Sequence, residues 1–167
     1  MNEAVAALRA GQAVILPTDT VYGLCVLPGH EDLLFELKGR DRSKPVALIA
    51  ADVEALIAAV PGLDRGVLER YFPGPYTLVF ESAGVRVPNL PPEAAAVVRA
   101  VGVVAATSAN LTGGPDPRRV EDIPEAIRAA CGAIVDAGEL PGTPSTVIDL
   151  RGDEPVVLRQ GAGPLLS

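Results

Sequence analysis

Short apolar runs alternate with helical patterns along the chain. Continuous apolar runs are typical of buried strands, and we predict seven of them, at 12–16, 45–50, 76–80, 101–106, 133–136, 146–150 and 156–159. Apolar residues at helical spacing predict helices at 2–9, 31–38, 52–60, 64–71, 92–100 and 124–130. Strands interleaved with helices indicate an α/β (α+β) fold, in which helices cover a mixed open sheet.

Length and composition limit the class of protein. A chain of 167 residues with 49% hydrophobic and 21% charged residues favours one globular domain over residues 1–167. No segment approaches the roughly 20 apolar residues of a membrane span, so we expect a cytoplasmic protein with no membrane partner. Cys25 and Cys131 are far apart and form no CxxC pair, so we expect reduced, buried packing residues.

Positive charge is concentrated in one segment. The formal net charge is -7, yet the seven residues KGRDRSK, at 38–44, hold four cations. Alternate positions share one face of an extended backbone, so this spacing suits a loop that holds an anion, although a solvated surface turn remains an alternative. The acidic total weighs against non-specific nucleic-acid binding, and we therefore expect a small anionic ligand.

Polar side chains gather next to three predicted strands. PTDTVYGL follows the run at 12–16, TSANLTGG follows the run at 101–106, and PSTVIDL opens the run at 146–150. Ligand sites on open α/β sheets collect at strand ends, although each segment alone is equally typical of an ordinary turn. His30 is the only histidine, which disfavours Ser-His or Cys-His nucleophilic catalysis.

Seven segments in the same order carry a family resemblance. They are PTDTVYGL, LKGRDRSKP, FPGPYTLVF, VRVPNLP, ATSANLTGG, PSTVIDL and LRQGAG, and they extend from about Gly11 to Gly163. Together they resemble the YrdC/Sua5 family of threonylcarbamoyl-AMP synthases, in a short form without the C-terminal domain of longer relatives. The resemblance implies a YrdC-like twisted mixed sheet with a concave, positively charged cavity.

The same resemblance implies an activity and its partners. The family binds ATP, L-threonine and bicarbonate, usually with Mg²⁺, and releases pyrophosphate as a nucleotidyltransferase. A separate transferase complex then passes the threonylcarbamoyl group to adenosine 37 of tRNA, a tRNA modification that serves translation. ATP, bicarbonate and the carboxylate of threonine are all negatively charged, which gives the cations at 38–44 a function.

The resemblance also assigns roles to residues of this sequence. The family's KxR and SxN pairs imply the catalytic residues Lys38, Arg40, Ser108 and Asn110. The implied ATP contacts are Arg40, Lys44, Ser82, Asn110, Arg118 and Arg159. The implied threonine contacts are Thr18, Thr20, Tyr22, Arg86, Ser108 and Ser145, with no protein ligand assigned to the metal. The sequence departs from the family at Ile49, where relatives often have histidine.

Two alternatives remain open from the sequence. One is a non-catalytic RNA- or ribosome-binding translation factor, for which the acidic balance predicts only weak RNA binding that falls steeply with salt. The other is a paralogous enzyme of the same fold that adenylates a different carbamate.

Overall fold

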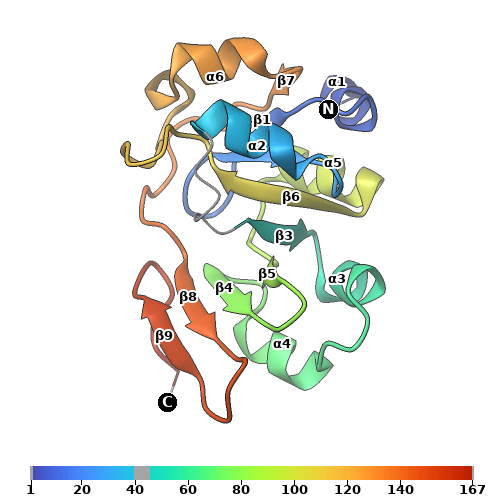
Figure 1. Cartoon of the computed structure of the whole chain (residues 1–167), viewed down its shortest axis with the longest axis vertical. Coiled ribbons are helices and arrows are strands. Elements are labelled where there is room, and N and C mark those ends of the chain that lie inside the picture. The colour runs from blue at the N-terminus through green and yellow to red at the C-terminus, as the bar shows by residue number, and fades with distance from the viewer. Residues whose placement is uncertain (1, 40–45, 167) are drawn as a thin grey trace.

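A computed structural model describes residues 2–39 and 46–166 of the chain (Figure 1). Its strands join one mixed sheet in the order β7-β1-β2-β6-β3-β5-β4-β8-β9. The strands are β1 (Val14–Leu16), β2 (Gly23–Val26), β3 (Ala47–Ala50), β4 (Tyr76–Val79), β5 (Gly84–Arg86), β6 (Val103–Ser108), β7 (Ala133–Ile134), β8 (Thr146–Asp149) and β9 (Val156–Arg159). Figure 1 shows β1, β2, β6 and β7 at one end of the molecule and β4, β5, β8 and β9 at the other, with β3 between them.

Six α-helices and one short 3₁₀ helix in the described residues flank the sheet. They are α1 (Asn2–Arg9), α2 (Glu31–Lys38), α3 (Val53–Ala59), α4 (Arg65–Tyr71), α5 (Pro92–Val101), α6 (Glu125–Ala130) and η1 (Val120–Asp122). Capping side chains set some of the boundaries. The Asp52 carboxylate accepts a hydrogen bond from Ala55 N at 2.8 Å at the start of α3, and Asp64 caps α4 in the same way. Gly39, at a φ of 98°, ends α2 directly after Lys38, because glycine tolerates the left-handed conformation there.

The helices pack on both faces of the sheet, and alternate strand residues belong to different clusters because side chains alternate between faces. Leu24 and Ala105 pack with α2 and α6, whereas Leu78 and Val85 pack with α3 and α4. On the other face, Val104 and neighbouring apolar residues pack under α1 and α5. Beyond these two helices, this second face forms the wall of a cavity.

The predicted mixed sheet flanked by helices is confirmed, and all six predicted helices are present within two residues at each end. Two strands were not predicted. β2 begins inside PTDTVYGL with a glycine, and β5 has only three residues, one of them an arginine. β6 extends two residues beyond its predicted end, because its pairing with β2 continues to Gly23 opposite Ser108.

Two further expectations concern membranes and cysteines. No helix in the described part of the chain is long and apolar enough to cross a membrane.

Both cysteines are free, and burial raises the pKa of Cys25 to about 12, so its thiol is protonated at neutral pH. Cys131 is only partly buried, which differs from the expectation, because it follows the short helix α6 near the surface.

Candidate functional site

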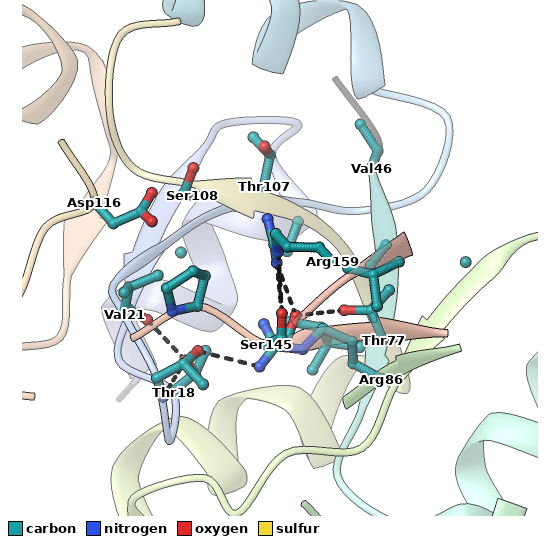
Figure 2. A pocket seen from close by; sticks show the side chains of 18 of the residues that line it. Thr18, Val21, Val46, Thr77, Arg86, Thr107, Ser108, Asp116, Ser145 and Arg159 are labelled. Carbon is teal, nitrogen blue, oxygen red and sulfur yellow. Dashed lines mark hydrogen bonds between the residues drawn. The ribbon is translucent and has the colours of Figure 1, made fainter. Parts of the chain in front are cut away.

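A cavity of about 790 Å³ lies on the second face of the sheet. Alternate residues of β2, β6, β3, β5, β4 and β8 line it, as expected for positions that share one face. In the middle strands these positions are small: Gly23, Ala47, Gly84 and Ala106. Because these side chains are small or absent, they leave an open space above the sheet. Polar side chains surround this space (Figure 2).

One polar cluster joins the end of α2 to the loop after β6. The Lys38 ammonium, which is buried, donates to Ser108 O at 2.8 Å, to Ser108 Oγ at 3.2 Å and to Asn110 Oδ1 at 2.6 Å. Ser108 Oγ also donates to Asn110 Oδ1 at 2.7 Å. These bonds fix the Ser108 and Asn110 side chains relative to each other, and they place one positive charge at this edge of the cavity.

The loop of the same cluster is held from its other side as well. Asn110 Nδ2 donates to Gly114 O at 2.9 Å and to Pro115 O at 3.2 Å. Thr112 N and Thr112 Oγ1 both donate to Lys38 O, at 3.1 and 2.9 Å. The end of α2 and the loop after β6 therefore form one hydrogen-bonded unit.

A second cluster lies between β1, β2 and β5. Thr18 and Thr20 are buried, and their hydroxyl oxygens are 3.0 Å apart. Arg86 Nη2 donates to Thr20 Oγ1 and to Asp19 Oδ1, both at 3.3 Å. The Asp19 carboxylate also accepts a hydrogen bond from Asn89 N at 3.0 Å.

The Arg86 guanidinium has an incomplete set of partners. Its side chain is only 12% exposed, and its Nε is buried without a hydrogen-bond partner among the described residues. Burial lowers the pKa of Arg86, Asp19 opposes that shift, and the nearby positive charge of Arg159 adds to it. A buried N–H without a partner is costly, so this position favours an anionic or polar ligand.

A third cluster stands across the cavity from the loop after β6. Arg159 Nε and Nη2 donate to Ser145 O at 3.1 and 2.9 Å, and Nη2 also donates to Ser145 Oγ at 3.2 Å. Thr77 Oγ1 and Ser145 Oγ are 2.7 Å apart. Figure 2 shows Arg159 extending over Ser145, with Thr77 beside Ser145. Arg86 and Thr18 lie lower in this view, and Ser108 and Asp116 lie at its upper left.

Cations outnumber carboxylates in the described lining of the cavity. The cationic lining residues are Lys38, Arg86, Arg151 and Arg159, and Asp116 is the one acidic residue there. Arg151 is already paired with Asp149, at 2.8 Å between Nη2 and Oδ2, and this pairing lowers the pKa of Asp149 to about 2. In residues 2–39 and 46–166, no group of three or more His, Cys, Asp or Glu side chains is placed to hold a metal ion.

Most of the residues predicted from the sequence lie together in this cavity. The predicted residues in the lining are Thr18, Thr20, Lys38, Arg86, Ser108, Asn110, Ser145 and Arg159. Arg40 and Lys44 lie outside the described residues.

Three predicted residues lie elsewhere in the structure. Tyr22 points away from the cavity into the core, where its hydroxyl donates to Gly138 O at 2.7 Å. Ser82 is exposed in the turn between β4 and β5 and is not in the lining. Arg118 is an exposed residue whose Nη2 pairs with Glu139 Oε1 at 2.9 Å, so its charge is compensated outside the cavity.

The structure also brings to the site residues to which the sequence assigned no binding role. Thr77 lines the cavity because it shares a face of the sheet with Gly84 and Arg86. Asp116 lines the cavity from the segment after the SxN pair. Asp19 pairs with Arg86, and its place inside PTDTVYGL was the available signal.

Comparisons with known proteins place the chain in a family. The Sua5/YciO/YrdC family model, described as telomere recombination, matches residues 6–161. The Bacillus subtilis protein named threonylcarbamoyl-AMP synthase is 33% identical, over 95% of this chain and 52% of its own length. The chain therefore spans about half the length of that relative.

Two solved structures have the same fold. P. abyssi Sua5 complexed with L-threonine superposes with a TM-score of 0.82 at 32% identity, covering 95% of this chain and 53% of that one. E. coli YciO superposes with a TM-score of 0.83 at 26% identity, covering 98% of this chain and 89% of that one. Because the family model matches nearly the whole length of the chain, the chain belongs to the Sua5/YciO/YrdC family.

Proposed function

We propose that the protein is a threonylcarbamoyl-AMP synthase, a nucleotidyltransferase that converts ATP, L-threonine and bicarbonate into L-threonylcarbamoyladenylate and pyrophosphate. The observation that carries the proposal is the convergence of the Lys38, Arg86 and Arg159 clusters on one cavity. The name of the Bacillus subtilis relative supports the activity, and the threonine complex of P. abyssi Sua5 supports the amino-acid substrate.

The Arg86 cluster fits the carboxylate of L-threonine. A guanidinium can donate two parallel hydrogen bonds to a carboxylate, and Nε of Arg86 has no partner among the described residues. The buried hydroxyls of Thr18, Thr20 and Ser145 lie near it and can bond the polar groups of an amino acid. Ile49 pairs with Arg86 across β3 and β5, so it presents an apolar wall where relatives often have histidine.

The Lys38 and Arg159 clusters fit the nucleotide. Phosphate groups need concentrated positive charge, and both of these cationic side chains line the cavity. We place the ATP phosphates between them, with Asn110 and Ser108 held in position by the Lys38 ammonium. Arg40 and Lys44 remain proposed phosphate contacts from the sequence.

The proposed reaction needs positioning and charge stabilisation. The amine nitrogen of threonine forms a bond to the carbon of bicarbonate, a C–O bond breaks and water leaves, which gives a carbamate. A carbamate oxygen then attacks the α-phosphorus of ATP. A new P–O bond forms, the bond between the α-phosphorus and its bridging oxygen breaks, and pyrophosphate leaves with the electron pair. Cations that face the phosphate oxygens stabilise the charge that develops there. The described lining contains no histidine, which is consistent with a mechanism that needs no imidazole base.

We propose that Mg²⁺ enters with the phosphates of ATP as part of the substrate. Mg²⁺ commonly binds through phosphate oxygens, waters and only one or two carboxylates. The described cavity offers the single carboxylate of Asp116, which fits this mode and does not fit a metal cage built by the protein. When bound, the ion would neutralise part of the phosphate charge.

The product has a defined use in this proposal. Threonylcarbamoyladenylate is a reactive mixed anhydride, so a transferase must take it up before water hydrolyses it. We propose that a separate tRNA-modifying complex transfers the threonylcarbamoyl group to adenosine 37 of tRNA, in the cytoplasm.

The activity is tested by pyrophosphate release. Purified protein with MgATP and bicarbonate is expected to release pyrophosphate only when L-threonine is added. Release that does not depend on threonine contradicts the proposal, and faster release with another amino acid identifies a paralogue that adenylates a different carbamate.

Filling the floor of the cavity is expected to block the reaction without unfolding the protein. A Cβ atom at Gly84 would meet its nearest neighbours, Val46 O and Thr77 Cγ2, at 3.8 and 3.9 Å, so β5 can accept a side chain. We expect Gly84→Val to lower threonine-dependent pyrophosphate release by at least about tenfold, because its methyl groups occupy substrate volume. The melting temperature should change little.

The matched control is Gly152→Val, in an exposed turn where a Cβ atom meets nothing within 4 Å. It introduces the same side chain outside the cavity and should leave turnover unchanged. Unchanged turnover in folded Gly84→Val would show that the substrates bind elsewhere.

A further inference from the structure

We propose that Asp19 is a positioning residue, which fixes the Arg86 guanidinium in the wall of the cavity so that it can bind a carboxylate ligand. The inference rests on the proposed function, because the ligand is the carboxylate of the amino-acid substrate. Asp19 itself is not in the lining of the cavity, so it acts through Arg86 and does not contact the ligand.

The Asp19 carboxylate is held at a fixed place. It lies in the loop between β1 and β2, and its Oδ2 accepts a hydrogen bond from the backbone N–H of Asn89 at 3.0 Å. Its Oδ1 accepts from Arg86 Nη2 at 3.3 Å. The segment after β5 therefore fixes one oxygen of the carboxylate, and the other oxygen holds the guanidinium.

Nη2 of Arg86 has a second acceptor, Thr20 Oγ1, at 3.3 Å. Thr20 is itself held, because Thr18 Oγ1 accepts from Thr20 N at 3.1 Å. A guanidinium is planar, so fixing Nη2 at two points also fixes the direction of Nε. The N–H of Nε is the donor of the guanidinium that has no hydrogen-bond partner among the described residues.

The charges around Arg86 give Asp19 a second role. Burial and the like charge of Arg159 both disfavour the charged guanidinium at this place, and Asp19 is the carboxylate that opposes them. Without the negative charge of Asp19, the guanidinium would gain by turning toward water and away from Arg159. Asp19 thus keeps a buried cation in place while leaving one of its donors for the ligand.

Asp19→Asn tests the role, because asparagine keeps the shape and can still accept from Asn89 N–H but lacks the charge. We expect the KM for L-threonine to rise about tenfold, with kcat and the KM for ATP nearly unchanged, because one charge-assisted anchor of Arg86 is lost. A general structural defect would instead lower kcat and affect ATP as well. Asp64→Asn makes the same chemical change at the start of α4, where asparagine is an equally good cap, and is the control.

Calorimetry separates this inference from the proposed function. L-threonine and L-threoninol, which lacks the carboxylate, are titrated into wild type and Asp19→Asn. Wild type that binds neither molecule contradicts the proposed function itself. Wild type that prefers threonine supports it, and the preference should shrink in Asp19→Asn. If Asp19→Asn keeps the full preference, or binds threonine more tightly, the positioning role of Asp19 is wrong.

Asp19→Glu keeps the test valid if Asp19→Asn does not fold. Glutamate retains the charge that compensates Arg86, but its extra methylene moves the carboxylate away from the present site. We expect the KM for L-threonine to rise in this variant too, and an unchanged KM would overturn the inference.

Discussion

The Arg86→Lys variant is expected to release pyrophosphate roughly 100-fold more slowly at low threonine concentration, because it loses a hydrogen bond to the charged carboxylate of the substrate, which contributes about 1.5–3 kcal/mol. Lysine keeps the positive charge, so the pair with Asp19 can persist and the fold should be retained. An ammonium cannot, however, keep the contacts with Asp19 and Thr20 and also donate in a second fixed direction, as a guanidinium can. The measurement is kcat/KM for L-threonine, together with a thermal melt.

Arg99→Lys is the control for this substitution. Arg99 is exposed on α5, and the same replacement there should change neither turnover nor the melt. If Arg86→Lys keeps wild-type kcat/KM, the guanidinium does not bind the threonine carboxylate, and the assignment of this end of the cavity is wrong.

The Lys38→Met variant is expected to lose both activity and stability. Methionine nearly matches the length of the side chain but removes the donor to Ser108 O, Ser108 Oγ and Asn110 Oδ1. Buried acceptors that lose a charged donor cost about 1–3 kcal/mol, so the free energy of unfolding should fall by that amount. Pyrophosphate release should fall at least about 100-fold, because Ser108 and Asn110 lose their orientation and the cavity loses a charge. Urea unfolding and turnover at saturating substrates measure the two effects.

Glu36→Met makes a comparable change on the exposed face of the same helix and should leave both quantities close to wild type. A Lys38→Met protein that is fully active would show that the hydrogen-bonded unit between α2 and the loop after β6 is dispensable. A protein that is destabilised but active would restrict Lys38 to a structural role.

The sequence predicted the helices well because their signals are local. α1 and α2 coincide with the predicted ranges 2–9 and 31–38, since apolar spacing and a following glycine mark them. β2 and β5 were missed because their residues become strands only through pairing with distant segments. β2 is held by β1 and β6, and β5 by β3 and β4.

Strand β2 also sets the direction of Tyr22, which the family resemblance assigned to the threonine contacts. Gly23, the next residue, faces the cavity, and side chains alternate along a strand, so Tyr22 points to the opposite face. Recognising β2 would have been enough to predict that Tyr22 lies outside the lining of the cavity. The position of Arg118 could not be predicted in this way, because its partner Glu139 is 21 residues away and no pattern in the sequence connects them.

Asp19 and Thr77 show that a residue's partners in the site could not be predicted from the sequence. Both lie within segments that carry the family resemblance, PTDTVYGL and FPGPYTLVF, but their positions depend on tertiary contacts. Thr77 lies next to Ser145 only because β4 pairs with β8, and Asp19 meets Arg86 only because the loop after β1 reaches the end of β5. The sequence thus indicated which segments form the site, whereas the pairings across the sheet required the structure.

The most direct test is a crystal structure of this protein with L-threonine and a non-hydrolysable ATP analogue. We expect the threonine carboxylate within hydrogen-bond distance of the Arg86 guanidinium, and the phosphates beside Lys38 and Arg159 in the cavity. Threonine bound away from Arg86, or phosphates outside the cavity, would contradict it.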